Sequence, residues 1–175
     1  NNGSYDNCGI KSLSLSKTAF TCANVGANTV VLTVTDNNNN VSACSAIVTV
    51  VNDLPSITSI TGPDGSQALG TIIEMSAIFV DVNLASATWY FSSDGTNYPN
   101  SLMFDGDISG NTITGTFNLP ANVYSVKLVI TDYCGKTAEL IYQFVVVYDP
   151  NGGFITGGGW INSPAEALVA KPTVT

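Results

Sequence analysis

The chain has 175 residues, of which 45% are hydrophobic and only 10% charged, and its formal net charge is −8. This composition excludes a disordered chain, because it supplies ample apolar material for packed cores. All five basic residues are lysine and histidine is absent, so a phosphate backbone would be repelled and the usual general base is missing. Nucleic-acid binding and histidine-dependent catalysis are therefore excluded. No apolar run approaches the roughly 20 residues of a membrane helix, so membrane insertion is not expected either.

One pattern, an apolar strand followed by Thr-Asp, occurs twice. The copies are Val30–Asp36 and Val126–Asp132, and Leu32 and Leu128 are 128 − 32 = 96 residues apart. A polar turn and a second apolar strand follow each copy. A repeat of this length favours tandem β-sandwich modules over a single enzyme fold. We therefore expect an all-β chain of tandem immunoglobulin-like β-sandwich modules.

The first module is predicted over residues 1–53. Alternating apolar residues begin at Ile10, and further strands are expected over 29–35 and 44–51, joined by an asparagine turn over 37–40. These strands are too few for a sandwich, which needs about seven. The first module is thus expected to be incomplete, its missing strands lying upstream of Asn1 or coming from another chain.

The second module is predicted over residues 54–149, after a linker that Pro55 ends. In the stretch 71–80, alternation places Ile73 and Phe79 inward and Glu74 outward. Strands are expected at 56–60, 71–80, 86–92, 111–117, 123–131 and 138–148, with turns at 62–65, 94–100, 105–110 and 118–122. Residues 150–175 are expected to form a linker and the start of a further module.

The four cysteines predict an oxidising compartment. Without histidine a zinc site is not expected, and Cys8 and Cys22 enclose a short turn-rich segment that suits a disulfide. Cys44 and Cys134 are not expected to bond to each other, because in modules stacked end to end they would lie about a module length apart. The sequence therefore predicts an exported protein with a Cys8–Cys22 disulfide.

Two segments resemble known families. Ser4–Ile10, Phe20–Gly26 and Leu32–Asp36 resemble the HYR (hyalin repeat) modules of bacterial surface proteins. Trp89–Thr96 and Tyr124–Asp132 are similar to motifs of PKD modules, although Tyr90 stands where that family has an aspartate. The resemblance implies immunoglobulin-like modules that act as spacers, stalks or adhesive repeats of large secreted proteins, and sometimes as accessory modules of extracellular hydrolases.

Aspartates and aromatic residues are the candidates for binding. Calcium prefers carboxylate and carbonyl oxygens, and candidate ligands for it stand in turns or at strand ends: Asp6, Asp36, Asp105, Asp107 and Asp132. The alternative is that these side chains only satisfy backbone groups of their turns. Trp89 is expected in the core, whereas Tyr90, Tyr98 and Trp160 are candidates for exposed aromatics that could stack on sugars.

The expected function is a non-catalytic structural or adhesive segment of a large cell-surface protein, in contact with other modules of the same protein. Two alternatives stay open. One is a carbohydrate-binding or accessory module of an extracellular hydrolase, which a row of exposed aromatics would favour. The other is a subunit of a self-assembling surface fibre, in which a neighbouring subunit supplies the strand that the first module lacks.

Overall fold

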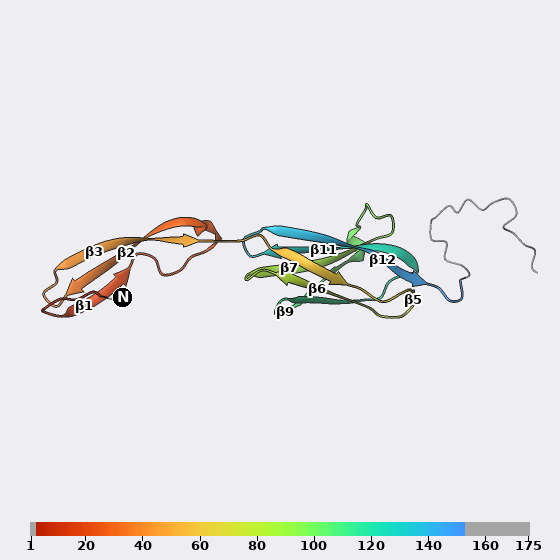
Figure 1. Ribbon diagram of the computed structural model, residues 1–175, viewed down its shortest axis with the longest axis horizontal. Coiled ribbons are helices and arrows are strands. Elements are labelled where there is room, and N and C mark those ends of the chain that lie inside the picture. Colours follow the sequence, from red (N-terminus) through yellow and green to blue (C-terminus); the bar gives the residue numbers. More distant parts are fainter. Residues whose placement is uncertain (1–2, 153–175) are drawn as a thin grey trace, which may run out of the picture.

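The computed structural model describes residues 3–152 and consists of β-strands with two short 3-10 turns. Two units lie end to end, the first built from strands β1 to β3 and the second from β4 to β12 (Figure 1). The predicted all-β class is confirmed. Among the described residues no helix is long and apolar enough to span a membrane. The predicted start of a further module falls almost entirely outside the described residues.

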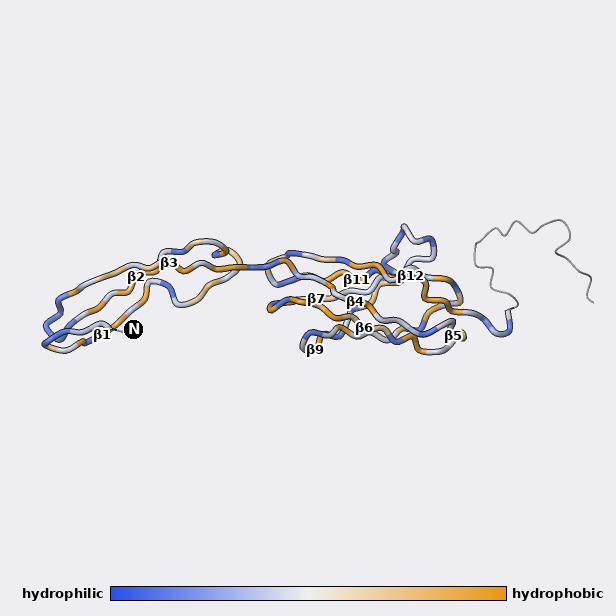
Figure 2. Tube along the Cα trace, viewed as in Figure 1, coloured by the Kyte–Doolittle hydropathy of each residue, from blue (hydrophilic) through white to orange (hydrophobic). Residues whose placement is uncertain are grey.

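The first unit is a single antiparallel sheet with the strand order β1-β2-β3. Its strands are β1 (Ile10–Leu15), β2 (Gly26–Asp36) and β3 (Val41–Val50). The β2–β3 turn is hydrophilic and lies at the end of the molecule that faces away from the second unit (Figure 2). Between β1 and β2 the chain forms only the 3-10 turn η1 (Cys22–Asn24), which lies at the other end of the sheet, beside the second unit.

The second unit is a sandwich of two sheets. One sheet has the order β4-β6-β10-β9, formed by β4 (Ser56–Thr61), β6 (Ile73–Val80), β10 (Thr112–Phe117) and β9 (Asp107–Ser109). The other has the order β5-β12-β11-β7-β8, formed by β5 (Gln67–Ala68), β12 (Thr137–Tyr148), β11 (Asn122–Asp132), β7 (Leu84–Ser92) and β8 (Met103–Asp105). All neighbours are antiparallel except β5 and β12. This is the arrangement of an immunoglobulin-like sandwich.

Aromatic residues fill the space between the two sheets. Trp89 on β7 is fully buried, as predicted, and its ring meets that of Phe117 edge to face with 6.0 Å between centroids. Tyr124, near the start of β11, is buried and donates a 3.0 Å hydrogen bond from its hydroxyl to the carbonyl of Pro120. Such a tyrosine corner is typical of immunoglobulin-like sandwiches. The predicted inward alternation of β6 is confirmed, because Ile73, Met75, Ala77 and Phe79 are all buried.

The long strands of the second unit begin and end within two residues of the predicted positions. The turn predicted over 105–110 is wrong in part, because Asp105 ends β8 and Asp107 begins β9. These two strands belong to opposite sheets, so the chain crosses from one sheet to the other at Gly106. A side chain at Gly106 would collide with Ile113, since an added Cβ would lie 2.7 Å from its Cγ2.

The predicted repeat is visible in the register of the sheets from Val30 and Val126 to the repeated aspartates, whereas a bulge between Tyr124 and Val126 has no counterpart in the first unit. Strands β1, β2 and β3 pair in the same order as β7, β11 and β12. Leu32 pairs with Leu15 and Cys44, and its counterpart Leu128 pairs with Trp89 and Leu140. One irregularity is shared, because β1 and β7 each carry one extra residue directly after the residue that pairs with the repeated aspartate. The single sheet of the first unit therefore corresponds to one of the two sheets in the second unit, the sheet that contains β7, β11 and β12.

The half that is present leaves an apolar face open. Leu13 and Leu15 are 42% and 50% exposed, whereas the residues at the same places in the second unit, Ala87 and Trp89, are 3% and 0% exposed. In the second unit that face is covered by β4, β6 and β10. Within the described part of the chain, no second sheet covers the first unit. The described part of the first unit is thus a single sheet, and not a two-sheet sandwich.

Candidate functional site

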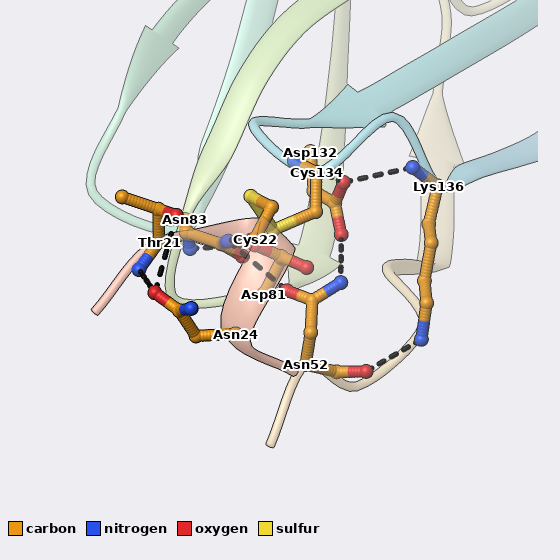
Figure 3. The surroundings of a disulfide bond; sticks show 9 residues. All are labelled: Thr21, Cys22, Asn24, Asn52, Asp81, Asn83, Asp132, Cys134 and Lys136. Carbon is orange, nitrogen blue, oxygen red and sulfur yellow. Dashed lines mark hydrogen bonds between the residues drawn. A yellow bond between two sulfur atoms is a disulfide. The ribbon is translucent and has the colours of Figure 1, made fainter. Parts of the chain in front are cut away.

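The junction between the two units is held by a disulfide and by side-chain hydrogen bonds. A disulfide joins Cys22, in the 3-10 turn of the first unit, to Cys134, in the β11–β12 turn of the second, with 5.2 Å between the Cα atoms (Figure 3). The bond spans 112 residues of sequence. The two units are therefore joined by two covalent connections, the peptide linker that follows β3 and this disulfide.

The predicted Cys8–Cys22 disulfide is therefore wrong. The backbone carbonyls of Cys8 and Gly9 accept hydrogen bonds from Asn37, at the turn end of the sheet, whereas Cys22 lies at the junction. Strand β1, with its 6 residues, separates the two cysteines and spans roughly 20 Å. A disulfide tolerates about 7 Å between Cα atoms, so this pair cannot bond. Cys8 and Cys44 are exposed free thiols.

The turn that carries Cys134 is organised by Asp132. One carboxylate oxygen of Asp132 accepts hydrogen bonds from the backbone N–H groups of Cys134 and Lys136, both at 2.8 Å. The backbone N–H of Asp132 donates to the carbonyl of Lys136 at 2.9 Å. Asp residues hold turns in this way because the short side chain reaches the N–H two residues on. These hydrogen bonds hold the backbone of Cys134 within the turn that faces Cys22.

Asn52, in the linker between the units, connects this turn to the rest of the junction. Its side-chain amide donates to the second carboxylate oxygen of Asp132 at 2.7 Å and accepts from the amide of Asn83 at 3.1 Å (Figure 3). Its backbone carbonyl accepts from the Lys136 ammonium at 2.5 Å. A single linker residue is thus held by three side chains of the second unit, which restricts rotation about the linker.

The protonation of Asp132 is tied to these contacts. Burial raises the pKa of this carboxyl. The hydrogen bonds from Asn52, Lys136 and Cys134 and the positive charge of Lys136 lower the pKa, and together they outweigh burial. The net pKa therefore lies below the ordinary value of 3.8. The carboxylate is therefore ionised at neutral pH, which is the form that can accept all of these hydrogen bonds.

The same turn occurs at the outer end of the first unit. Asp36 accepts from the backbone N–H groups of Asn38 and Asn40 at 2.8 Å, and its second oxygen accepts from the side chain of Asn40. The side-chain hydrogen bond of Asn40 is the largest cause of the lowered pKa of Asp36. Asn39 takes φ = +69°, where Gly135 takes +83° in the second unit. Asparagine tolerates this left-handed conformation better than other residues with a side chain.

The five aspartates predicted as calcium ligands are not brought together. Asp36 lies in the turn at the outer end of the first unit, and Asp132 lies in the β11–β12 turn of the second unit, at the junction. Asp6 accepts from the backbone N–H of Cys8, and Asp105 and Asp107 are exposed on two sheets. Within residues 3–152, no three His, Cys, Asp or Glu side chains lie close enough together to hold a metal ion. The carboxylates of Asp6, Asp36 and Asp132 satisfy backbone groups of their own turns, which is the alternative use expected from the sequence.

Two of the aromatic residues that were candidates for sugar stacking share a cation. The Lys127 ammonium lies 4.6 Å from the ring centroid of Tyr98 and 5.6 Å from that of Tyr90, and it also lies 3.7 Å from a carboxylate oxygen of Glu139. Both tyrosines are only partly exposed. The lysine covers one face of each ring, and that face is therefore not open for stacking on a sugar. Trp160 lies outside the described residues.

Sequence reasoning missed the junction, although it singled out its parts. Asp132 and Cys134 were each noted, but Asn52 carried no signal because a lone asparagine in a linker is ordinary. The one available clue was positional: the β11–β12 turn immediately follows a repeated Thr-Asp, and a turn at the end of a module is where a neighbouring module makes contact.

Comparison with known proteins adds little to this account. No protein-family model matches the chain, and no curated protein matches it. Among solved structures, the chain is similar to the fibronectin(III)-like modules of CbhA from Clostridium thermocellum, with 10% identity and a TM-score of 0.45, covering 84% of this chain and 83% of that chain. A likeness this weak carries no argument about function. The immunoglobulin-like architecture rests instead on the sheet order and the core described above.

Proposed function

We propose that this chain is a non-catalytic structural segment of a longer extracellular protein, in which two immunoglobulin-like units are held as one rigid body. The observation that carries the proposal is the junction. A single peptide linker would let the units swivel, whereas a linker, a disulfide and the contacts of Asn52 together fix their orientation. A fixed orientation is what a spacer or stalk requires, because it sets the distance between whatever lies at either end.

Several features support the chemical and cellular side of this proposal. A disulfide that spans the two units favours an oxidising compartment outside the cytoplasm. The lack of histidine and arginine removes the commonest catalytic and anion-binding side chains. The finer assignment to HYR and PKD modules of a secreted adhesin or stalk belongs to the same proposal, supported by the motif likeness and by the repeated turn at Asp36 and Asp132.

Rigidity can be measured by residual dipolar couplings of the backbone amides. In the oxidised protein, couplings from both units are expected to fit one alignment tensor, and in a Cys22→Ser/Cys134→Ser variant they are expected to need two. The matched control is Cys8→Ser/Cys44→Ser, which replaces the same number of cysteines without changing the junction and is expected to keep one tensor. Two different tensors in the oxidised wild type would overturn the proposal.

The open face of the first unit indicates where this segment meets its neighbour. In the second unit, β4 and β6 cover the face and precede β7 in the chain, with β4 beginning 84 − 56 = 28 residues before β7. Because β1 is the counterpart of β7, covering strands at the same spacing would begin about 28 residues before Ile10. We therefore assign the cover to chain that precedes Asn1 in the parent protein, with inward apolar residues like those of β6.

This assignment is tested with a hydrophobic dye. The 175-residue chain is expected to bind the dye at Leu13 and Leu15, and a chain extended upstream by about 40 native residues is expected to lose that binding. Leu13→Ser/Leu15→Ser should reduce dye fluorescence in the short chain, whereas Val82→Ser, at an exposed valine of the second unit, should not. Dye binding that persists after extension would contradict the assignment, and a mass that then rises with concentration would identify a second copy as the cover instead.

A further inference from the structure

The disulfide changes the path that tension takes through the chain. Covalent bonds lead from the amino-terminal side to Cys22, across the two sulfur atoms to Cys134, and on to the carboxyl-terminal side. The segment between the two cysteines is a closed loop, and it contains β2 and β3 and every described strand from β4 to β11. Tension applied at the two ends of the chain therefore does not pass along this segment.

The described strands outside the loop are β1, before Cys22, and β12, after Cys134. Both lie along the path of the tension. Strand β1 runs from the outer end of the first unit towards the junction, and β12 runs from the junction towards the opposite end of the second unit (Figure 1). A pull on the chain thus acts on each strand from end to end along its own axis, rather than peeling it sideways from its neighbour.

A strand pulled along its axis has almost no length to give. Strand β12 has 12 residues and spans at most roughly 40 Å at about 3.3 Å per residue, which is close to the limit of a fully extended chain except at the bulge where Phe144 takes φ = +69°. It also lies inside its sheet, hydrogen-bonded to β5 on one side and β11 on the other. Tension along β12 therefore neither lengthens it nor opens the core that it helps to cover.

We propose that the chain is a load-bearing link in which the Cys22–Cys134 disulfide routes tension along β1 and β12 and around the folded core. This inference rests on the proposed structural function and gives it a mechanical form. With the bond intact, the strands that carry Trp89 and Phe117 lie inside the loop and off the path of the tension. Without it, the same pull passes through every strand of both units in turn, and the loop of 112 residues adds roughly 390 Å of extended chain at about 3.5 Å per residue.

Single-molecule force spectroscopy tests the proposal on the 175-residue chain with handles at both ends. Cys8→Ser/Cys44→Ser serves as the reference, so that the bridged pair is the remaining cysteine pair, and it is compared with the variant in which all four cysteines are serine. The four-serine variant is expected to gain roughly 390 Å more in contour length on full extension than the reference. Equal gains in the two proteins would overturn the proposal.

The four-serine variant could fail to fold, and a second measurement covers that case. The reference protein is held at constant force while dithiothreitol is added. Dithiothreitol passes two electrons and two protons to the sulfurs of Cys22 and Cys134 and closes to its own cyclic disulfide. A single lengthening of roughly 390 Å, or its equivalent in several steps, is expected after reduction, and no lengthening would refute the load path.

These measurements separate the two proposals. The contour length reports which residues the disulfide excludes from the load, and it does not depend on the relative orientation of the units. Dipolar couplings report that orientation and do not depend on load. Two alignment tensors together with a protected loop would remove the rigid-spacer function and leave the load path standing. One alignment tensor together with equal contour lengths would leave the rigid spacer standing and remove the load path.

Discussion

Removing the disulfide should cost the second unit a large part of its stability. The perturbation is Cys22→Ser/Cys134→Ser, which opens a loop of 112 residues. In the chain-entropy model, closing a loop of that length reduces the freedom of the unfolded chain by an amount worth roughly 5 kcal/mol. The value varies only with the logarithm of loop length, so it changes little if the first unit stays folded while the second unfolds. Few single changes in a domain of this size are expected to cost more.

The assay is urea unfolding followed by tryptophan fluorescence. Trp89 is fully buried in the second unit and reports its core, and a Trp160→Phe background makes it the sole tryptophan. With an m-value of about 2 kcal/mol/M, the expected loss lowers the urea midpoint by roughly 2.5 M. The m-value should also be larger in the variant, because an unfolded chain without the cross-link exposes more surface.

The control is Cys8→Ser/Cys44→Ser, whose midpoint should match that of the wild type, because these thiols are exposed and unbonded. A midpoint for Cys22→Ser/Cys134→Ser within about 0.3 M of the wild type would refute the reasoning, since it would mean a loss well under 1 kcal/mol. Loss of stability with an unchanged m-value would instead point to native-state contacts, and not to the unfolded chain, as the source of the effect.

Three further predictions concern the second unit and the turns. Gly115→Ala should lower the free energy of unfolding by about 1–3 kcal/mol in urea titration, because an added Cβ would lie 2.3 Å from Cζ of Phe117, and an unchanged midpoint would contradict this. Tyr124→Phe should cost about 1 kcal/mol through the lost hydrogen bond to Pro120, whereas Tyr5→Phe, at an exposed ring, should cost nothing measurable. Melting temperature should be steady from neutral pH to about pH 5 and fall as the pH drops below 3.8. Hydrogen bonds hold the folded-state pKa of Asp36, Asp94 and Asp132 below 3.8, those of Asp94 coming from the backbone N–H groups of Asn97 and Thr96, and these contacts are lost on protonation. A flat profile down to pH 2 would exclude their role.

Much of the fold follows from alternation along the sequence. The long strands were predictable because each presents one apolar face, as β6 does with Ile73 and Phe79 inward and Glu74 outward. Strands β5, β8 and β9 were missed because they have only 2 or 3 residues, which is too short for a periodic pattern. Strand β5 pairs with β12, which is distant in the sequence, and β8 pairs with β7 across the segment 93–102, so no short turn encodes their pairing. Strand β9 instead forms a hairpin with β10 across Gly110 and Asn111, a local turn that the predicted strand at 111–117 did not extend back across.

The junction was less predictable, for a geometric reason. Sequence separation indicates how long a loop is, but it does not show at which end of a sheet each residue emerges. Cys8 and Cys22 are close in sequence and lie at opposite ends of β1, whereas Cys22 and Cys134 are distant in sequence and meet at the junction. Asp36 and Asp132 were correctly placed at strand ends, whereas Asp105 and Asp107 were expected in a turn and lie in two short strands. Their use in turns was one of two expectations, and the structure supplies donors for Asp36 and Asp132 from their own turns.

The repeated turn has a consequence for any longer array built from such units. At the outer end of the first unit, Asn38 occupies the position that Cys134 has in the second, since 134 − 38 = 96. The second carboxylate oxygen of Asp36 accepts from Asn40 of its own turn, whereas the equivalent oxygen of Asp132 accepts from Asn52 in the linker. A disulfide from this turn position therefore cannot form at that end. Bending of the parent protein should concentrate there, so that it behaves as stiff pairs joined by pivots and not as a uniformly stiff filament.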